Sequence, residues 1–447
     1  MIGMKSKFKL GDALLLIGTL AVFGLSIVLW IFIMTNDQYF NRISQTSRVA
    51  EQTRSHRDRI VSNLYIPTNS YGFKNGQLYR LYDAKKNLPL EFVKEIKGVK
   101  YRNIKKISTD KKQYEEMLHN SECVQLSFPK EVSINLFTKK NVKKGDPKFR
   151  RIFITNSNDF LYLGNDKTYT IYRINLIKGD FNKLRSYASN ARGKIPVEFV
   201  RLKNCYEVFF TKQDHWRIYS YLTNTQTDSY FVSRLLGTTN VTTRSNKKGW
   251  VTYSLNYYTN LRVPKAKTDR HDFHYTRYEK RKDITLNDQL LESVNFVHKL
   301  GLSEQDLRYF DTTDDSISYA NYVEGIPVFW DNSSPQVMTS FTGDAVKVDF
   351  NNTDLQIPIP FDGQTKTLPA SITVMQRLVN AGMRKEEIQR IIVAFGVEKD
   401  NSHDHLVNLV PGYYVKAYNQ WKSLAEWEKV DFLSLNKYKQ AIMEEGK

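Results

Sequence analysis

Residues Ala13–Met34 read ALLLIGTLAVFGLSIVLWIFIM, a stretch of 22 residues without a charge. At about 1.5 Å per helical residue, this stretch exceeds the roughly 30 Å hydrocarbon layer of a bilayer, so it predicts a transmembrane helix over residues 13–34. The preceding segment, residues 1–12, carries Lys5, Lys7 and Lys9. The positive-inside rule keeps such a segment in the cytoplasm. The sequence therefore predicts a single-pass protein of the cell membrane, with a cytoplasmic amino terminus and most of the chain extracellular.

The end of the apolar stretch indicates whether this helix is retained. A cleaved signal peptide has a shorter apolar core and small residues before the cut. Here the stretch ends in the bulky residues Trp30, Ile31, Phe32, Ile33 and Met34. We therefore predict an anchor that is not cleaved.

Three residues within the stretch could form a contact surface for another helix. Gly18 would let a second backbone approach closely, and the hydroxyls of Thr19 and Ser26, seven residues apart, share one helix face. The alternative is that these residues bond only within their own helix, as they do in many spanning helices. The stretch alone leaves both interpretations open.

Composition limits the class of the remaining chain. The 447 residues are 41% hydrophobic and 25% charged, which is typical of globular protein and long enough for about three domains. The net charge of +19 would suggest nucleic acid if the chain were cytosolic. Outside a membrane the polyanions are lipid headgroups and envelope polymers, and the sequence holds no recognised nucleic-acid module. We expect no nucleic-acid partner.

The two cysteines, Cys123 and Cys205, have no CxxC spacing and no nearby histidine pair that would complete a zinc site. Free thiols are the favoured interpretation. An exported compartment also permits one disulfide bridge, and the sequence leaves that alternative open.

The periodicity of the hydrophobic residues, and the glycines and prolines between periodic stretches, divide the exported part into segments. We predict a polar stalk at 35–63, α+β domains with antiparallel sheets at 64–193, 194–283 and 284–425, and a charged tail at 426–447. Helices are expected at 89–98, 110–120, 227–237, 285–301 and 371–382. Strands are expected at 150–156, 167–177, 197–202, 205–211, 216–222, 240–245, 249–256, 259–264, 272–280, 316–330, 347–361, 388–398 and 406–424. Segment 316–330 is expected to contain a turn at Glu324 and Gly325, and a hairpin turn is expected at 246–249. Asp110 is the expected N-cap of the second helix, with Glu115 in its first turns.

Motifs of catalysis are absent from the sequence. There is no GxSxG elbow, HExxH, Walker loop, EF-hand loop, or GxGxxG after a strand. We therefore predict no enzymatic activity, no catalytic residue, no cofactor and no metal.

Three clusters of polar residues could instead form a metal site or a catalytic site. Asp400, His403, Asp404 and His405 could hold the metal of a hydrolase, but a polar loop between strands is favoured because no further ligands are evident. His271, Asp272 and His274 start a predicted strand, with the imidazoles on opposite faces. The carboxylates Asp311, Asp314 and Asp315 are expected to form a turn between helix and strand.

Three segments resemble a known family. In LRYFDTTDDSISYANYVEGIPVFW (307–330), the positions Tyr319, Tyr322, Gly325, Pro327 and Phe329 are similar to a hairpin of the YycH (WalH) family. In DNSHDHLVNLVPGYYVKAYNQW (400–421), the positions Pro411, Tyr414 and Trp421 are similar to its closing segment, although a Trp is common in the family near Gly412 or Tyr413. The segment SNKKGWVTYSLN (245–256) resembles a turn and strand of its middle unit.

The resemblance implies a fold and a function. It implies three exported domains, of which the last two are similar to those of the related protein YycI, and no enzymatic activity. It further implies a complex with YycI and the sensor histidine kinase WalK (YycG) of the WalK/WalR (YycG/YycF) two-component system, which controls cell-wall metabolism. The family signals largely through its transmembrane helix, which favours Gly18, Thr19, Val22 and Ser26 as residues that face a partner. A homo-oligomer remains open.

Two other functional hypotheses are alternatives to this regulatory role. One is an exported module whose basic surface binds an anionic envelope polymer. The other is a metal-dependent hydrolase centred on His403 and His405.

Overall fold

The computed structural model describes Thr19, Val22, Phe23, Ser26 and residues 61–436, apart from 62, 83–86, 97–98, 138–146, 192, 266–267, 269, 281–284, 303–305, 331–332, 360–362, 401–402 and 404. The chain divides into two compact units, Met1–Arg59 and Ile60–Lys447. In the first unit Thr19, Val22, Phe23 and Ser26 are helical and exposed. Among the described residues no helix is both long and apolar enough to cross a membrane. The rest of the predicted span 13–34, with Gly18, lies outside the described residues, as do segment 1–12 and the stalk up to residue 60.

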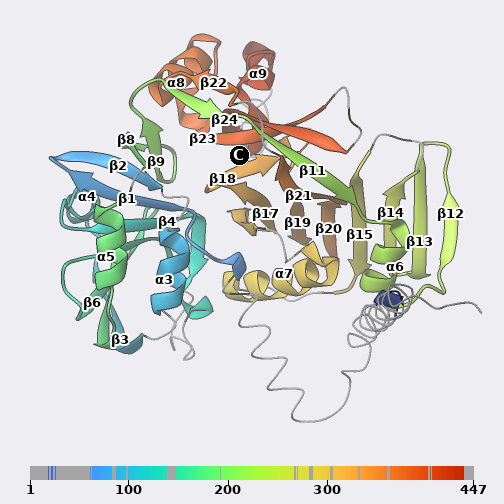
Figure 1. The fold of residues 1–447 in the computed structure, drawn as a ribbon, viewed down its shortest axis with the longest axis horizontal. Coiled ribbons are helices and arrows are strands. Elements are labelled where there is room, and N and C mark those ends of the chain that lie inside the picture. The colour runs from blue at the N-terminus through green and yellow to red at the C-terminus, as the bar shows by residue number, and fades with distance from the viewer. Residues whose placement is uncertain are drawn as a thin grey trace, which may run out of the picture. The chain divides into compact units, whose positions relative to one another are not determined.

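The second unit contains two large, mostly antiparallel sheets, which confirms the predicted α+β class (Figure 1). The first sheet has nine strands, in the order β3 (Lys100–Ser108), β7 (Thr170–Lys178), β6 (Phe160–Asn165), β5 (Lys148–Ile154), β4 (Val124–Ser133), β1 (Asn69–Lys74), β2 (Gln77–Tyr82), β8 (Gly193–Arg201) and β9 (Tyr206–Phe210). Helices α3 (Leu88–Ile96) and α5 (Asn182–Ser189) contact each other over one face of it, and α4 (Lys111–Leu118) packs near β6 through Tyr114.

The second sheet runs through strands from both later thirds of the chain. Its order is β12 (Thr242–Ser245), β13 (Trp250–Asn256), β14 (Thr259–Pro264), β15 (Asp272–Tyr278), β20 (Ala345–Asn351), β19 (Val337–Phe341), β17 (Ser316–Val323), β18 (Ile326–Phe329), β23 (Ile388–Lys399), β24 (Leu406–Ala417), β11 (Tyr219–Thr225) and β21 (Thr353–Ile359). In addition, β16 (Leu307–Thr312) pairs with β17, and β25 (Gln420–Ser423) pairs with β24. Helices α6 (Asp228–Leu236) and α7 (Leu286–Leu300) contact each other and pack on this sheet.

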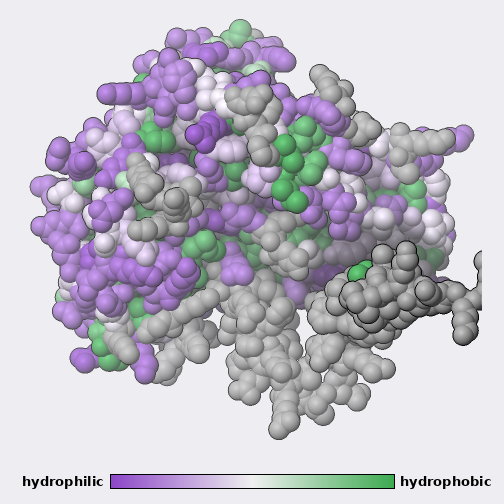
Figure 2. Space-filling model, viewed as in Figure 1, coloured by the Kyte–Doolittle hydropathy of each residue, from purple (hydrophilic) through white to green (hydrophobic). Residues whose placement is uncertain are grey.

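A smaller layer lies beside β24. It comprises the strand pair β10 (Asp214–Arg217) and β22 (Thr365–Leu368) with helices α8 (Ser371–Asn380) and α9 (Leu424–Trp427). Most large apolar side chains of the described residues are in the interior, and on the face drawn in Figure 2 the exposed hydrophobic residues form small separate groups among hydrophilic ones.

The five predicted helices are present as α3, α4, α6, α7 and α8, whereas α5 and α9 were not predicted. The Asp110 carboxylate accepts a hydrogen bond from the Gln113 amide at 2.9 Å, as expected of an N-cap. Gly237 and Gly301 end α6 and α7 at φ of 75° and 73°, a conformation that glycine adopts without a Cβ penalty. The predicted hairpin turn at 246–249 joins β12 to β13.

Four predicted elements differ in the structure. The strand expected at 406–424 is the hairpin of β24 and β25, because the chain turns at Tyr418 and Asn419, both at positive φ. The strand expected at 216–222 breaks after Arg217, because β10 pairs with β22 while β11 pairs with β21 and β24. The strand expected at 347–361 breaks at Asn352, where β20 ends and β21 joins the opposite edge of the sheet. The tail expected from 426 begins inside the fold, since Trp427 and Phe432 are buried in the core.

The predicted domain boundaries remain predictions, but the sheets cross two of them. Strands β8 and β9, which follow the boundary at 193, belong to the first sheet. Strands β15 and β20, on either side of the boundary at 283, are hydrogen-bonded neighbours.

Candidate functional site

The residues that carry the resemblance come together mainly in one aromatic cluster. Phe329 of β18 stacks on Tyr414 of β24, with ring centroids 4.5 Å apart and an interplanar angle of 15°. Trp421 of β25 lies 5.7 Å from Phe329, and Phe310 of β16 lies 5.2 Å from it. Tyr322 belongs to the same buried cluster. Five strands from two separate parts of the sequence, residues 307–329 and 406–423, are therefore held together by one set of packed rings.

The other positions of the resemblance determine strand pairing or the conformation of a turn. Pro327 lies opposite Tyr322 in the β17–β18 hairpin, and Pro411 lies opposite Phe395 in the β23–β24 ladder. Gly325, in the turn of that hairpin, has φ of 75°. A Cβ there would lie 3.2 Å from Arg80 Nη2 and 3.4 Å from the Thr68 carbonyl oxygen. Glycine is required by both the left-handed backbone and this close approach to the first sheet.

The structure contradicts the prediction that Asp311 is part of a turn. Asp311 is in β16, just after a bulge in its pairing with β17, and only Asp314 and Asp315 lie in the bend between these strands. Its buried carboxylate accepts hydrogen bonds from Lys416 Nζ at 2.5 Å and from Trp421 Nε1 at 2.8 Å. Burial alone would raise the pKa of Asp311, but Lys416 and Lys130 outweigh it and lower this pKa.

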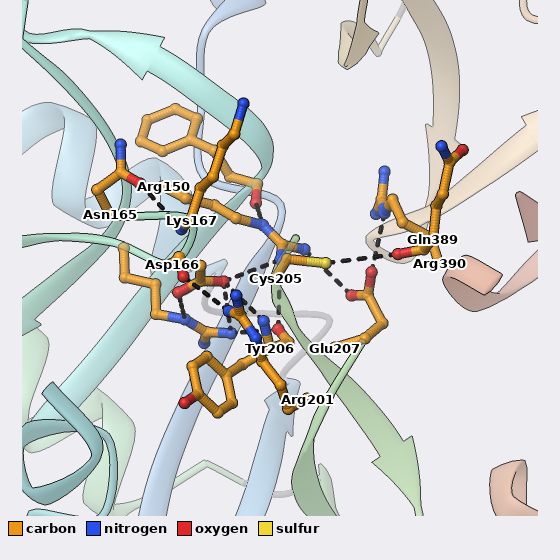
Figure 3. A network of polar contacts seen from close by, with 12 residues as sticks. Arg150, Asn165, Asp166, Lys167, Arg201, Cys205, Tyr206, Glu207, Gln389 and Arg390 are labelled. Atoms are coloured by element: carbon orange, nitrogen blue, oxygen red, sulfur yellow. Dashed lines mark hydrogen bonds and ion pairs between the residues drawn. The ribbon is translucent and has the colours of Figure 1, made fainter. Parts of the chain in front are cut away.

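Next to this aspartate lies a larger set of buried charges, which we call the junction network: Arg150, Arg151, Asp166, Glu207 and Arg390. Figure 3 shows four of them and the hydrogen bonds around them. Arg150 donates to Asp166 at 3.0 Å and to Glu207 at 3.1 Å. Arg151 donates to Asp166 at 2.8 Å, and Arg390 donates to Glu207 at 2.8 Å. All five residues are buried.

The junction network connects the two large sheets. Arg150 and Arg151 are in β5 and Glu207 is in β9, all in the first sheet, whereas Arg390 is in β23 of the second. The pairing of β23 with β24 shifts register between Ile388 and Arg390. Such a bulge re-aims the side chains that follow it. The Glu207 carboxylate is thereby shared by a guanidinium from each sheet.

Electrostatics keep both carboxylates of the junction network ionised. Burial would raise the pKa of Glu207, but Arg390 and Arg150 together lower it. Burial would likewise raise the pKa of Asp166, but Arg151 and Arg150 lower it, and the Tyr114 hydroxyl donates to it at 2.5 Å. Removing one of these carboxylates would leave arginines buried without a counter-charge.

A cavity of about 60 Å³ adjoins the junction network. Residues of both large sheets and of the connections next to them line it: Thr68, Asn69, Tyr71, Arg80, Ser127, Pro129, Arg150, Arg151, Glu207, Val208, Phe210, Phe310, Tyr322, Gly325, Ile326, Pro327, Arg390, Ile391, Ile392 and Val393. The hairpin of the resemblance therefore forms part of the cavity wall.

The entry of the chain into the second unit is fixed by a buried tyrosine. Val61 and Leu64 are buried in the core, and the Tyr65 hydroxyl donates to the Leu290 carbonyl oxygen of α7 at 2.7 Å. The same hydroxyl lies 2.6 Å from the Tyr319 hydroxyl of β17. Tyr319 also bonds to Ser293 of α7. This clasp attaches the segment that follows the predicted stalk directly to α7 and β17.

The histidine clusters are arranged as small polar pairs. His274 Nδ1 lies 2.6 Å from an Asp349 oxygen, and His274 Nε2 lies 3.3 Å from Asp272. His403 Nδ1 lies 3.2 Å from Asp400, whereas Asp404 is outside the described residues. Among the described residues no group of three or more His, Cys, Asp or Glu side chains could hold a metal ion. Cys123 and Cys205 are free thiols, as predicted.

Comparison with known proteins decides the family. The model of the family "YycH protein, C-terminal domain" matches residues 207–431, just over half of the chain. The chain belongs to the YycH family. The crystal structure of YycH from Bacillus subtilis has a similar fold, with a TM-score of 0.65 at 15% sequence identity, and the match covers 81% of this chain and 96% of that one. No curated protein sequence matches.

The YycH C-terminal domain begins at Glu207, the residue that joins both sides of the junction network. Asp311, Arg390, Lys416 and the aromatic cluster lie within it, whereas Arg150, Arg151 and Asp166 precede it. The network thus attaches this domain to the sheet before it.

The sequence contains one sign of the junction network that motif and periodicity searches do not detect, namely charged residues inside apolar strands. Arg150 and Arg151 lie between Phe149 and Ile152 in a strand that is otherwise buried. Glu207 and Arg390 likewise interrupt apolar strands. A charged residue inside a buried strand needs a partner of opposite charge. The sequence could have indicated buried ion pairs, though not which strands pair.

Proposed function

We propose that the chain is a non-enzymatic regulator of the sensor histidine kinase WalK (YycG), and that it acts in a complex with YycI to control cell-wall metabolism. Membership of the YycH family, carried by the match over residues 207–431, is the observation on which this rests. The proposal places the chain in the cell membrane as a single-pass protein, with residues 13–34 as the span and the second unit outside the cell. It assigns no residue a catalytic role.

The proposed mechanism joins the membrane helix to the exported unit. Contacts of the span with a kinase helix would favour one of two kinase conformations, and a regulator shifts such an equilibrium only by contacting the two conformations differently. The Tyr65 clasp supports a mechanical link, because a displacement of the preceding segment reaches α7 and β17 through buried hydrogen bonds. The exported unit would thereby set the position of the span.

The partner-facing residues of the span are proposed to be Gly18, Thr19, Val22 and Ser26. Thr19, Val22 and Ser26 are helical and exposed in the structure, and their spacing puts them on one side of an ideal helix. This face presents the small and hydroxyl side chains that membrane helices use for close packing.

Cysteine crosslinking in membranes tests this proposal. Ser26→Cys should form a crosslink to a transmembrane helix of the sensor kinase, whereas Ile17→Cys, which is on the opposite face of an ideal helix, should form none. Equal capture from both positions would remove the assigned face. Capture of no kinase from any position of the span, with unchanged kinase output after deletion of residues 1–40, would refute the proposed function.

A further inference from the structure

The cavity beside the junction network has more positive than negative charge in its wall. Four guanidinium groups line it, from Arg80, Arg150, Arg151 and Arg390, together with one carboxylate, Glu207. Asp166 adds a second carboxylate behind Arg150 and Arg151. Two guanidinium charges of this set thus have no buried carboxylate of their own. A buried charge without a counter-charge destabilises the folded protein, so a further anion in this cavity would add stability.

Arg80 contributes most clearly to this excess. Its side chain is buried in β2, and it donates to the Asn69 side-chain oxygen at 3.2 Å and to the Glu324 carbonyl oxygen at 3.3 Å. Both acceptors are neutral. Burial lowers the pKa of Arg80, and the nearby Tyr71, Tyr82 and the exposed Glu324 carboxylate offset this only in part.

Two of the lining arginines carry a donor atom without a hydrogen bond. Nη1 of Arg151 and Nη1 of Arg390 are buried and have no hydrogen-bond partner among the residues that the structure describes. The guanidinium groups lie over the rings of Phe199 and Trp421, respectively, at 4.5 and 5.3 Å. A buried donor without an acceptor destabilises the folded protein, and more so when it is charged. Guanidinium groups are well suited to bind the oxygens of phosphate or carboxylate in pairs.

We propose that this cavity is a binding site for a small tetrahedral oxyanion of the phosphate class. A single buried water needs about 10–15 Å³ of such space, so about 60 Å³ accommodates an ion of roughly five heavy atoms. Arg80, Arg151 and Arg390 supply the donors, and Glu207 stays engaged with Arg150 and Arg390. This site does not depend on the proposed kinase partnership.

The ligand would strengthen the contact between the two sheets. Arg80, Arg150 and Arg151 come from the first sheet and Arg390 from the second, so one anion neutralises guanidinium groups from both. Binding to the folded state alone raises its stability with ligand concentration. The oxyanion should therefore make the junction more resistant to separation.

Equilibrium dialysis and thermal unfolding of the full chain in detergent micelles test the site. Inorganic phosphate is titrated at constant ionic strength, with sodium chloride making up the difference, so that screening does not change. We expect saturable binding of one phosphate per chain, competition by sulfate, and a midpoint of unfolding that rises with phosphate and not with chloride.

Arg80→Gln is the informative variant because it removes a charge without leaving a carboxylate unpaired. It should weaken phosphate binding by about tenfold or more. In phosphate-free buffer it should unfold at the same temperature as the wild type or a higher one, because the empty site then holds less excess charge. A merely structural arginine would give a lower midpoint instead. The matched control is Arg234→Gln, since Arg234 also donates to backbone carbonyls but lies outside the cavity.

A second arm distinguishes two sources of the phosphate group. Dimethyl phosphate represents a phosphodiester, as in lipid headgroups and envelope polymers, whereas inorganic phosphate represents the free ion. Saturable binding of either probe that weakens in Arg80→Gln supports the site. The probe that binds more tightly identifies whether a phosphodiester or the free ion is the ligand. No saturable binding of either, or equal binding by wild type and Arg80→Gln, would overturn the proposal.

Discussion

Glu207→Gln should be among the most destabilising single substitutions in the second unit. Glutamine keeps the shape of the side chain but removes the charge that Arg150 and Arg390 share at 3.1 and 2.8 Å. Arg150 retains Asp166, whereas Arg390 loses its closest carboxylate. All of these groups are buried, so bulk solvent does not screen the charge that is left behind.

The expected cost follows from that burial. Breaking a buried ion pair by removing one partner typically costs about 3–5 kcal/mol of unfolding free energy, because the remaining charge stays buried. Glu387→Gln is the matched control, since Glu387 pairs with the more exposed Lys203 at 3.4 Å. A pair near the surface contributes about 0–1 kcal/mol.

Urea unfolding of the full chain in detergent, followed by circular dichroism, measures both variants. The pH dependence supplies a second readout. The pKa of Glu207 in the folded protein is lower than the roughly 4.3 of an unfolded glutamate. Its contribution is therefore complete above that pH and is lost as the pH falls below it. Wild type should lose stability on acidification more steeply than Glu207→Gln.

A double-mutant cycle with Arg390→Met separates the pair from its surroundings. The double variant should be more stable than the sum of the two single effects predicts, by about 0.5–3 kcal/mol, because neither partner is then left alone. If Glu207→Gln costs no more than Glu387→Gln, or if the two effects are additive, then the junction network does not hold the sheets together.

Three further predictions concern other parts of the fold. Tyr65→Phe should cost about 1–3 kcal/mol in the same urea assay, because the Leu290 carbonyl oxygen and Tyr319 lose a buried partner; the exposed Tyr257→Phe should cost nothing measurable, and equal effects would contradict the clasp. Gly325→Ala should cost about 1–2 kcal/mol for the left-handed backbone, and more because its Cβ would approach Arg80 and Thr68; Gly76→Ala, at a similar φ of 76° with nothing within 4 Å of the Cβ, should cost less, and equal costs would argue against the close approach. Burial raises the pKa of Cys123 to about 12, so a thiol reagent should label it slowly in the folded protein and rapidly in urea; rapid labelling of the folded chain would show that Cys123 is accessible.

Local features of the fold were predictable from the sequence. The N-cap Asp110, the glycines Gly237 and Gly301, and the turn at Gly325 act through their own backbones, so their effect does not depend on distant residues. The five helices that the sequence predicts accordingly lie where they are expected, whereas α5 and the β1–β2 hairpin were not predicted.

Partners that are distant in the chain were not predictable. Asp311 belongs to the polar run DTTDDS, which is typical of a turn, yet Lys416 and Trp421 of the closing strands hold it inside β16. The breaks at Arg217 and Asn352 likewise depend on which strand each half pairs with. Sheet pairing is set by non-local contacts, which periodicity in one segment does not encode.

The candidate site was predicted only in part. The resemblance singled out Tyr322, Phe329, Tyr414 and Trp421, and the structure gathers them in one cluster beside the cavity. The junction network itself escaped prediction, because its members come from strands in different sheets.

The proposed function requires that the predicted membrane span brings this protein to a sensor histidine kinase. Purification of the full chain in mild detergent, with mass spectrometry of the membrane proteins that accompany it, shows whether this contact forms. The matched control replaces residues 13–34 by an unrelated apolar span of equal length. We predict that WalK and YycI accompany the native chain, and that WalK is lost or strongly reduced with the replaced span. Absence of WalK from the native purification, or equal recovery with both spans, would contradict this claim.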